Sequence, residues 1–120
     1  MEKKTITREY QNNLNNNAFD SMGYLKQLYL NENQLPVVKK SWFKNLKKLE
    51  ILGLNNDEIL EIENNAFGSL VNLKQLYIGY NKLTLVKESW LKNLTRLEIL
   101  GLDNNEILEI ENNAFDSLVN

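Results

Sequence analysis

The sequence predicts an α/β solenoid, with short parallel strands on a concave face and irregular or helical segments returning along the convex side. The main observation is a repeat of 24 residues, in which leucine followed by x-x-Leu-x-Leu begins at Leu25, Leu49, Leu73 and Leu97. A second observation is the length of 120 residues, which holds five such units with no remainder. We therefore expect a single solenoid over residues 1–120, with units 1–24, 25–48, 49–72, 73–96 and 97–120.

Units two to five follow the pattern L-x-x-L-x-L-x-x-N-x-L, whose leucines and asparagine fill the interior of such a repeat. Asp57 replaces the asparagine in the third unit, and an ionised carboxylate accepts hydrogen bonds but cannot donate them. The first unit is degenerate. Ile6, Leu14, Phe19 and Met22 stand at core positions, but Met1 and Lys4 replace the early leucines, so we expect a partial N-terminal cap.

A second period of 48 residues lies over the first. Units three and five are identical at 21 of 24 positions, and units two and four at 14 of 24. Such near-identity indicates either a recent duplication or a designed module, and the sequence does not separate the two. The larger and smaller residues of the return segments also alternate (Trp42, Ala66, Trp90, Ala114), which predicts that the tryptophans are packing residues.

Charge alternates with the same period. Units two and four carry net charges of +5 and +4, whereas units three and five carry −5 and −6. The second position of successive units is occupied in turn by Glu2, Lys26, Glu50, Lys74 and Glu98. In a parallel sheet this row places opposite charges side by side, which favours the correct register but adds little stability. Because basic and acidic layers alternate, the chain offers no continuous basic stripe for nucleic acid.

The sequence lacks the residue types that several kinds of catalytic and metal-binding sites require. The chain has no cysteine and no histidine, and its serines have no partner for nucleophilic catalysis. Two carboxylate groups lack the glycine-centred loop of a dedicated calcium site: Glu58, Glu61, Glu63 and Glu106, Glu109, Glu111. We therefore expect no enzymatic activity, no cofactor and no metal site. No apolar run is long enough to span a membrane, and the N-terminus does not resemble a signal peptide.

The concave face has a candidate binding surface. The fifth position of each unit points away from the core, and the row there reads Thr5, Tyr29, Gly53, Tyr77, Gly101. Isoleucines stand two positions earlier in units three and five, on a face that should be wet. One interpretation is that each ring packs across its neighbouring glycine. The other is a patch that anchors a protein partner, made of Tyr29, Ile51, Lys74, Tyr77, Tyr80 and Ile99.

The last unit presents a complete apolar layer with no sixth unit to cover it. Its members are Leu100, Leu102, Ile107, Ile110, Phe115 and Leu118. Repeat arrays normally need a polar capping layer at this position. Fraying, head-to-tail stacking and tail-to-tail pairing are the alternatives. We expect a tail-to-tail homodimer that is strengthened by salt, because salt screens the repulsion between the two acidic layers.

The units resemble the 24-residue "typical" class of leucine-rich repeats, found in Toll-type receptors, Slit, small proteoglycans and insect immune proteins. The resemblance rests on the leucine spacing and on phenylalanine at the nineteenth position, at Phe19, Phe43, Phe67 and Phe115. It implies a right-handed solenoid and protein recognition on the concave face, often in immunity or adhesion. Members of this class usually carry cysteine-bearing caps, so their absence favours an excised or designed module.

Two hypotheses for function follow. The first is a non-enzymatic protein–protein interaction module that self-associates through its C-terminal unit, as a designed or truncated scaffold. The alternative is an extracellular immune or adhesion domain that binds a protein on its concave face. A candidate N-glycosylation site at Asn93, in Asn93-Leu94-Thr95, favours an extracellular ancestor. The sequence does not identify the ligand or the compartment.

Overall fold

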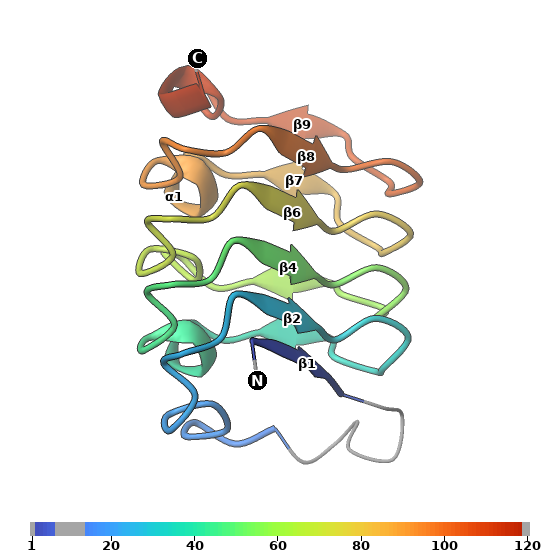
Figure 1. Ribbon diagram of the computed structural model, residues 1–120. Helices are drawn as coiled ribbons and strands as arrows, with labels where there is room; N and C mark the ends of the chain where they lie inside the picture. The colour runs from blue at the N-terminus through green and yellow to red at the C-terminus, as the bar shows by residue number, and fades with distance from the viewer. Residues whose placement is uncertain (1, 7–13, 119–120) are drawn as a thin grey trace.

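The computed structural model describes residues 2–6 and 14–118 and shows the predicted α/β solenoid (Figure 1). Its concave face is a five-stranded parallel sheet in the order β1-β2-β4-β6-β8. The strands are β1 (Lys3–Thr5), β2 (Gln27–Tyr29), β4 (Ile51–Gly53), β6 (Gln75–Tyr77) and β8 (Ile99–Gly101). Neighbouring strands pair with an offset of 24 residues, so residues at the same position of successive units lie side by side.

The convex side is irregular, with little helix. Two short parallel pairs lie there: β3 (Val37–Val38) with β5 (Glu61–Ile62), and β7 (Leu85–Val86) with β9 (Glu109–Ile110). The described helices are a 3-10 helix at Lys40–Phe43, the α-helix α1 at Glu88–Leu91 and a 3-10 helix at Asp116–Leu118. None of the described helices is long and apolar enough to cross a membrane.

The core lies between these two layers and runs along the solenoid. The middle leucine of each strand is fully buried in β2, β4 and β6, because the alternation of the strand turns it inward. Trp42 and Trp90 are both buried, which confirms that they are packing residues. The indole Nε1 of Trp90 donates a hydrogen bond of 3.1 Å to the carbonyl oxygen of Ile62.

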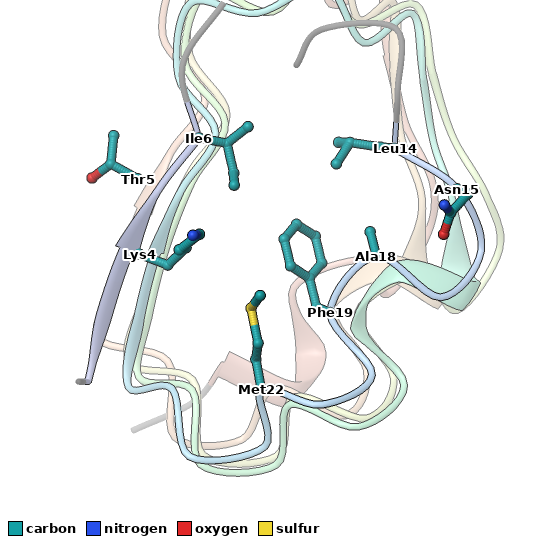
Figure 2. Close-up of a pocket in the computed structure, with 8 residues that line it drawn as sticks. All are labelled: Lys4, Thr5, Ile6, Leu14, Asn15, Ala18, Phe19 and Met22. Carbon is teal, nitrogen blue, oxygen red and sulfur yellow. The ribbon is translucent and has the colours of Figure 1, made fainter. Parts of the chain in front are cut away.

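The described residues of the N-terminal unit, 2–6 and 14–24, lie at one end of the core. Ile6 and Phe19 are buried and Met22 is half-buried, as predicted for core positions. They border a cavity of about 300 Å³, into which Lys4 also points while Thr5 points away (Figure 2). Lys4 pairs with Leu28 of β2, so a lysine occupies the position of the strand leucine in this unit. Its long side chain is exposed, which is consistent with a polar outer layer.

Candidate functional site

The two tyrosines of the concave face lie against the glycines beside them. Pairing places Tyr29 next to Gly53 and Tyr77 next to Gly101. A Cβ atom at Gly53 would lie 2.9 Å from Cδ1 of Tyr29, and one at Gly101 would lie 3.3 Å from Cδ1 of Tyr77. Both rings are half-buried. Each ring occupies the space above its neighbouring glycine, where the side chain of a larger residue would otherwise lie.

Glutamine side chains fix the hydroxyl groups of these tyrosines. The hydroxyl of Tyr29 donates to Oε1 of Gln27 at 2.9 Å, and that of Tyr77 donates to Oε1 of Gln75 at 2.7 Å. Lys3 Nζ lies 5.3 Å from the centroid of the Tyr29 ring, within cation–π distance. These contacts favour one orientation of each ring, and a side chain that is already ordered loses less conformational entropy when it binds a partner.

The other residues of the predicted patch differ in exposure. Ile51 is half-buried in the middle of the sheet, whereas Ile99 on β8 is 44% exposed. Lys74 is exposed, and it lies just before β6 rather than on the strand. Tyr80 lies beyond the other end of β6 and is 52% exposed. The patch therefore extends from one end of the strands to the other.

Tyr80 has an unusual backbone conformation. Its φ angle is 56°, and the same position of units two, three and five also has positive φ, at Glu32 (63°), Asn56 (61°) and Asn104 (57°). Asparagine tolerates this left-handed conformation, but a large aromatic residue adopts it at a cost. Because half of the Tyr80 side chain is exposed, burial does little to offset that cost. Exposed residues in strained conformations are enriched at binding sites.

A shallow hollow surrounds Tyr80 at the turns that follow the strands. We call it the turn-side hollow; its volume is about 400 Å³, and its lining includes Asn56, Glu58, Tyr80, Lys82, Asn104 and Glu106. Lys82 Nζ lies 3.9 Å from Oε1 of Glu58, an exposed ion pair of little energetic value. The hollow thus combines one exposed aromatic ring with amide, carboxylate and ammonium groups that can form hydrogen bonds with a ligand.

A second hollow lies at the opposite end of the strands, where the chain enters them. We call it the entry-side hollow; its volume is about 180 Å³ and its lining is Lys26, Lys48, Glu50, Asn72, Lys74 and Arg96. Sequence reasoning treated Lys26, Glu50 and Lys74 only as a register row and did not identify this site. The signal was present in the last position of each unit, where Lys48, Asn72 and Arg96 stand beside that row.

The row of alternating charges is in register, as predicted. The backbone N–H of Glu50 donates to the carbonyl oxygen of Lys26, and that of Lys74 donates to Glu50, both at 2.8 Å. The ion pairs in the described part of the chain lie elsewhere, at Lys44–Asp20 (3.7 Å) and Lys82–Glu58. The alternation therefore does not neutralise the lysines of this row by direct pairing.

A ladder of asparagine side chains stabilises the turns next to the turn-side hollow. The amide nitrogen of Asn81 donates to the carbonyl oxygens of Leu54 (2.9 Å) and Ile78 (3.1 Å). Its Oδ1 accepts a hydrogen bond of 2.9 Å from the backbone N–H of Asp57 in the preceding unit. Each rung therefore joins two units and satisfies backbone groups that are buried in the core.

Asp57 forms the third-unit rung with a carboxyl group. Its Oδ1 accepts a hydrogen bond from the backbone N–H of Asn33, but its Oδ2 is buried and has no hydrogen-bond partner among the described residues. Burial raises the pKa of Asp57 from 3.8 to about 7, the Asn33 hydrogen bond lowers it, and the charge of Glu32 raises it further. This carboxyl is part of the core and is not available to a ligand.

The C-terminal unit exposes the apolar layer that the sequence analysis singled out. Ile110 is 50% exposed and Phe115 is 39% exposed, whereas their equivalents Ile62 and Phe67 are fully buried. The remaining four members are half-buried at the edge of the core: Leu100, Leu102, Ile107 and Leu118. Leu108 is 88% exposed, which the repeat pattern did not indicate.

The remaining candidate sites of the sequence analysis lie outside these surfaces. Asn93 is exposed, and its side-chain nitrogen donates a hydrogen bond of 3.3 Å to the carbonyl oxygen of Gly68. In the described residues, no group of three or more His, Cys, Asp or Glu side chains is placed to hold a metal ion. The carboxylates at Glu58–Glu63 and Glu106–Glu111 therefore do not converge on a metal site there.

The pattern of the leucine rich repeat family matches residues 23–83 and 72–120, most of the chain. Among solved structures, TLR13 in its complex with ssRNA13 is 30% identical, with a TM-score of 0.73 over 97% of this chain. The leucine-rich repeat domain of APL1B is 20% identical, with a TM-score of 0.80 over 87% of this chain. Toll, in the Toll–Spatzle complex of Drosophila, is 22% identical, with a TM-score of 0.75 over 82%.

This chain spans only 15%, 32% and 13% of the lengths of those three chains, respectively. The curated proteins give no match to the sequence.

Proposed function

The chain belongs to the leucine-rich repeat family, whose members are generally non-enzymatic binding modules, and we propose that it binds a protein partner on its concave face. The partner would contact the rings of Tyr29 and Tyr77 and Ile51 on the strand between them. It would also contact Ile99 on the neighbouring strand β8, and Tyr80 beyond the strands. Similarity to Toll and TLR13 supports the related proposal that the chain derives from an extracellular recognition protein. The candidate glycosylation of Asn93 belongs to that proposal.

The conformation of Tyr80 is the observation that supports this function best. The aromatic ring is 52% exposed on a backbone with φ 56°, where two equivalent units have asparagine. Asparagine would relieve strain at this position, and about half of the ring that it would remove is exposed to solvent. A residue that costs stability and remains exposed is better explained by binding than by packing.

A peptide library displayed on phage and panned against the chain tests the proposal. The affinity of the selected peptides would be measured by fluorescence anisotropy for the unmodified chain, for Tyr80→Asn and for Leu60→Asn. Leu60 is 60% exposed and lies next to β5 on the other side of the solenoid, so it controls for general loss of exposed apolar surface. We expect a loss of about tenfold for Tyr80→Asn, on the scale of one interface anchor, and none for Leu60→Asn. Peptides that bind Tyr80→Asn undiminished, or a panning without binders, would contradict the proposal.

A second candidate function is self-association through the C-terminal unit. The specific observation is the contrast between Phe115, which is 39% exposed, and its buried equivalent Phe67. A second copy that pairs tail to tail would cover this apolar layer with an identical one. The two acidic units would then face each other, so salt should strengthen the dimer.

Light scattering during size-exclusion chromatography tests this candidate. Absolute mass would be measured at two protein concentrations and two salt concentrations, for the unmodified chain and for a variant with Phe115→Ser and Leu118→Ser. We expect a dimer that tightens with salt and is lost in the variant. A monomer under all conditions, or a dimer that persists in the variant, would contradict tail-to-tail pairing.

A further inference from the structure

The entry-side hollow concentrates positive charge from two separate units. Lys26 and Lys48 come from unit two, and Lys74 and Arg96 from unit four. Glu50 and Asn72 of unit three lie between these two cationic pairs. The lining therefore carries four cations against one carboxylate, although the whole chain has a net charge of −2.

Hydrogen bonds hold part of this lining in place. Arg96 Nη1 donates to Oδ1 of Asn72 at 2.8 Å, and Nδ2 of Asn72 donates to the carbonyl oxygen of Lys47 at 2.7 Å. The guanidinium is thus anchored to the layer below through one of its donors. Its other donors and the exposed ammonium groups remain for an anionic ligand.

The spacing of the cations indicates the kind of anion. Parallel strands lie about 4.8 Å apart, so the pairs in units two and four are separated by roughly 10 Å along the solenoid. Glu50 occupies the layer between them and would repel an anion there. A ligand with uninterrupted charge, such as a sulfated glycan or a nucleic acid, would place a charged group against Glu50. A ligand with two anionic groups separated by this distance can contact both cationic pairs without placing a charge against Glu50.

An extended peptide can present two carboxylates at this distance. In the polyproline II conformation the chain rises about 3.1 Å per residue with three residues per turn. Acidic side chains three residues apart therefore lie on one side of the peptide, about 9 Å from each other. A peptide N–H between them can donate to the Glu50 carboxylate, which turns the central charge into a hydrogen-bond acceptor for the ligand.

We propose that the entry-side hollow binds an acidic extended peptide segment whose two carboxylates, three residues apart, contact Lys26 and Lys48 on one side and Lys74 and Arg96 on the other. This inference rests on the proposed function, because it names the chemistry of a protein partner beside the same concave face. The segment would lie along the solenoid axis, beside the N-terminal ends of β2, β4 and β6 (Figure 1).

Fluorescence anisotropy with labelled synthetic peptides tests the proposal directly. One proline-rich peptide carries two glutamates three residues apart, with one non-proline residue between them to supply the peptide N–H. An isomer of the same composition carries the glutamates next to each other. We expect the first to bind more tightly, and its affinity to fall about tenfold in Lys26→Gln and in Lys74→Gln. The matched control is Lys40→Gln. Lys40 is an exposed lysine of unit two, as Lys26 is, but it lies on the convex side in the 3-10 helix Lys40–Phe43.

Glu50→Gln gives a second and opposite readout. Removing this carboxylate should weaken the preference for separated glutamates and allow binding of heparin, a continuous polyanion, which the unmodified chain should bind poorly. Equal affinity for the two isomers, or heparin that binds the unmodified chain more tightly than either peptide, would overturn the proposal. Binding that persists in the Lys26→Gln, Lys74→Gln double variant would do the same.

The two proposals can fail separately. Failure of both synthetic peptides to bind would remove the acidic-peptide site, while the effect of Tyr80→Asn on library-selected peptides would still decide the concave face. Conversely, peptides that bind the entry-side hollow and are unaffected by Tyr80→Asn would support the cationic site alone.

Discussion

The backbone N–H of Asn33 donates a hydrogen bond to Oδ1 of Asp57, the residue at the same position of the next unit. In the next rung, Asn81 Oδ1 accepts from Asp57 in the same way, and its side-chain nitrogen also donates to two carbonyl oxygens. Asp57 cannot make such donations when it is ionised, and in the part of the chain that the structure describes its Oδ2 is buried without a hydrogen-bond partner. The ladder is therefore weakest at the third unit, and its strength there depends on pH.

Asp57→Asn should stabilise the protein at high pH and have little effect at low pH. The pKa of Asp57 is raised from 3.8 to about 7, so the folded state holds this proton more tightly than the unfolded state. The resulting stabilisation is complete below pH 3.8 and is lost as the pH rises through about 7. One pKa unit corresponds to about 1.4 kcal/mol, so the loss is on the order of 4 kcal/mol.

Urea unfolding followed by tryptophan fluorescence at pH 5 and pH 8 measures this difference, because both tryptophans are buried. The control is Asp103→Asn, which makes the same chemical change at an exposed carboxyl of the last unit. A gain for Asp57→Asn that is equal at the two pH values would show that the carboxyl does not titrate between them.

Tyr80→Asn should raise the free energy of unfolding by about 1 kcal/mol, because it relieves a strained left-handed backbone. The comparison is Tyr24→Asn, since Tyr24 is similarly exposed (49%) and does not have positive φ. That variant should be neutral or slightly destabilising. Chemical denaturation of both variants checks the prediction, and destabilisation by Tyr80→Asn would mean that the ring makes contacts that outweigh its strain.

Trp90→Phe should cost more stability than Trp42→Phe. The indole of Trp90 donates to the carbonyl oxygen of Ile62, whereas Nε1 of Trp42 is buried without a hydrogen-bond partner in the described residues. Phenylalanine therefore leaves a carbonyl group unsatisfied in the first variant and removes an unsatisfied donor in the second. We expect a difference of about 1 kcal/mol in urea unfolding. Equal losses would indicate that the hydrogen bond contributes nothing net.

Phe67→Ala and Phe115→Ala compare the same side chain in the interior and at the C-terminal face. Phe67 is fully buried, and its truncation should cost about 3–5 kcal/mol. Phe115 is 39% exposed, so its truncation should cost clearly less when the protein is dilute. If a second copy covers this face, the loss for Phe115→Ala should grow with protein concentration in thermal unfolding. A cost that is independent of concentration would argue against such a contact.

The sequence by itself determined the fold and the register of the concave face. A constant repeat of 24 residues requires equivalent positions to stack, so the rows through Tyr29 and Gly53 and through Lys26 and Glu50 follow from counting. The burial of the tryptophans follows in the same way, because an equivalent unit lies on each side of both.

Only the tertiary structure revealed the backbone strain at Tyr80, the entry-side hollow and the raised pKa of Asp57. The strain at Tyr80 comes from a backbone conformation that the turns of units two to five share, and side-chain identity alone does not reveal it. The entry-side hollow combines residues from the end of one unit and the start of the next, which no single motif contains. The raised pKa of Asp57 reflects the loss of water around a carboxyl whose position in the repeat is otherwise ordinary. Periodicity determines which residues are neighbours. Backbone strain, the grouping of cations in one hollow and the desolvation of a carboxyl depend instead on how closely those neighbours approach.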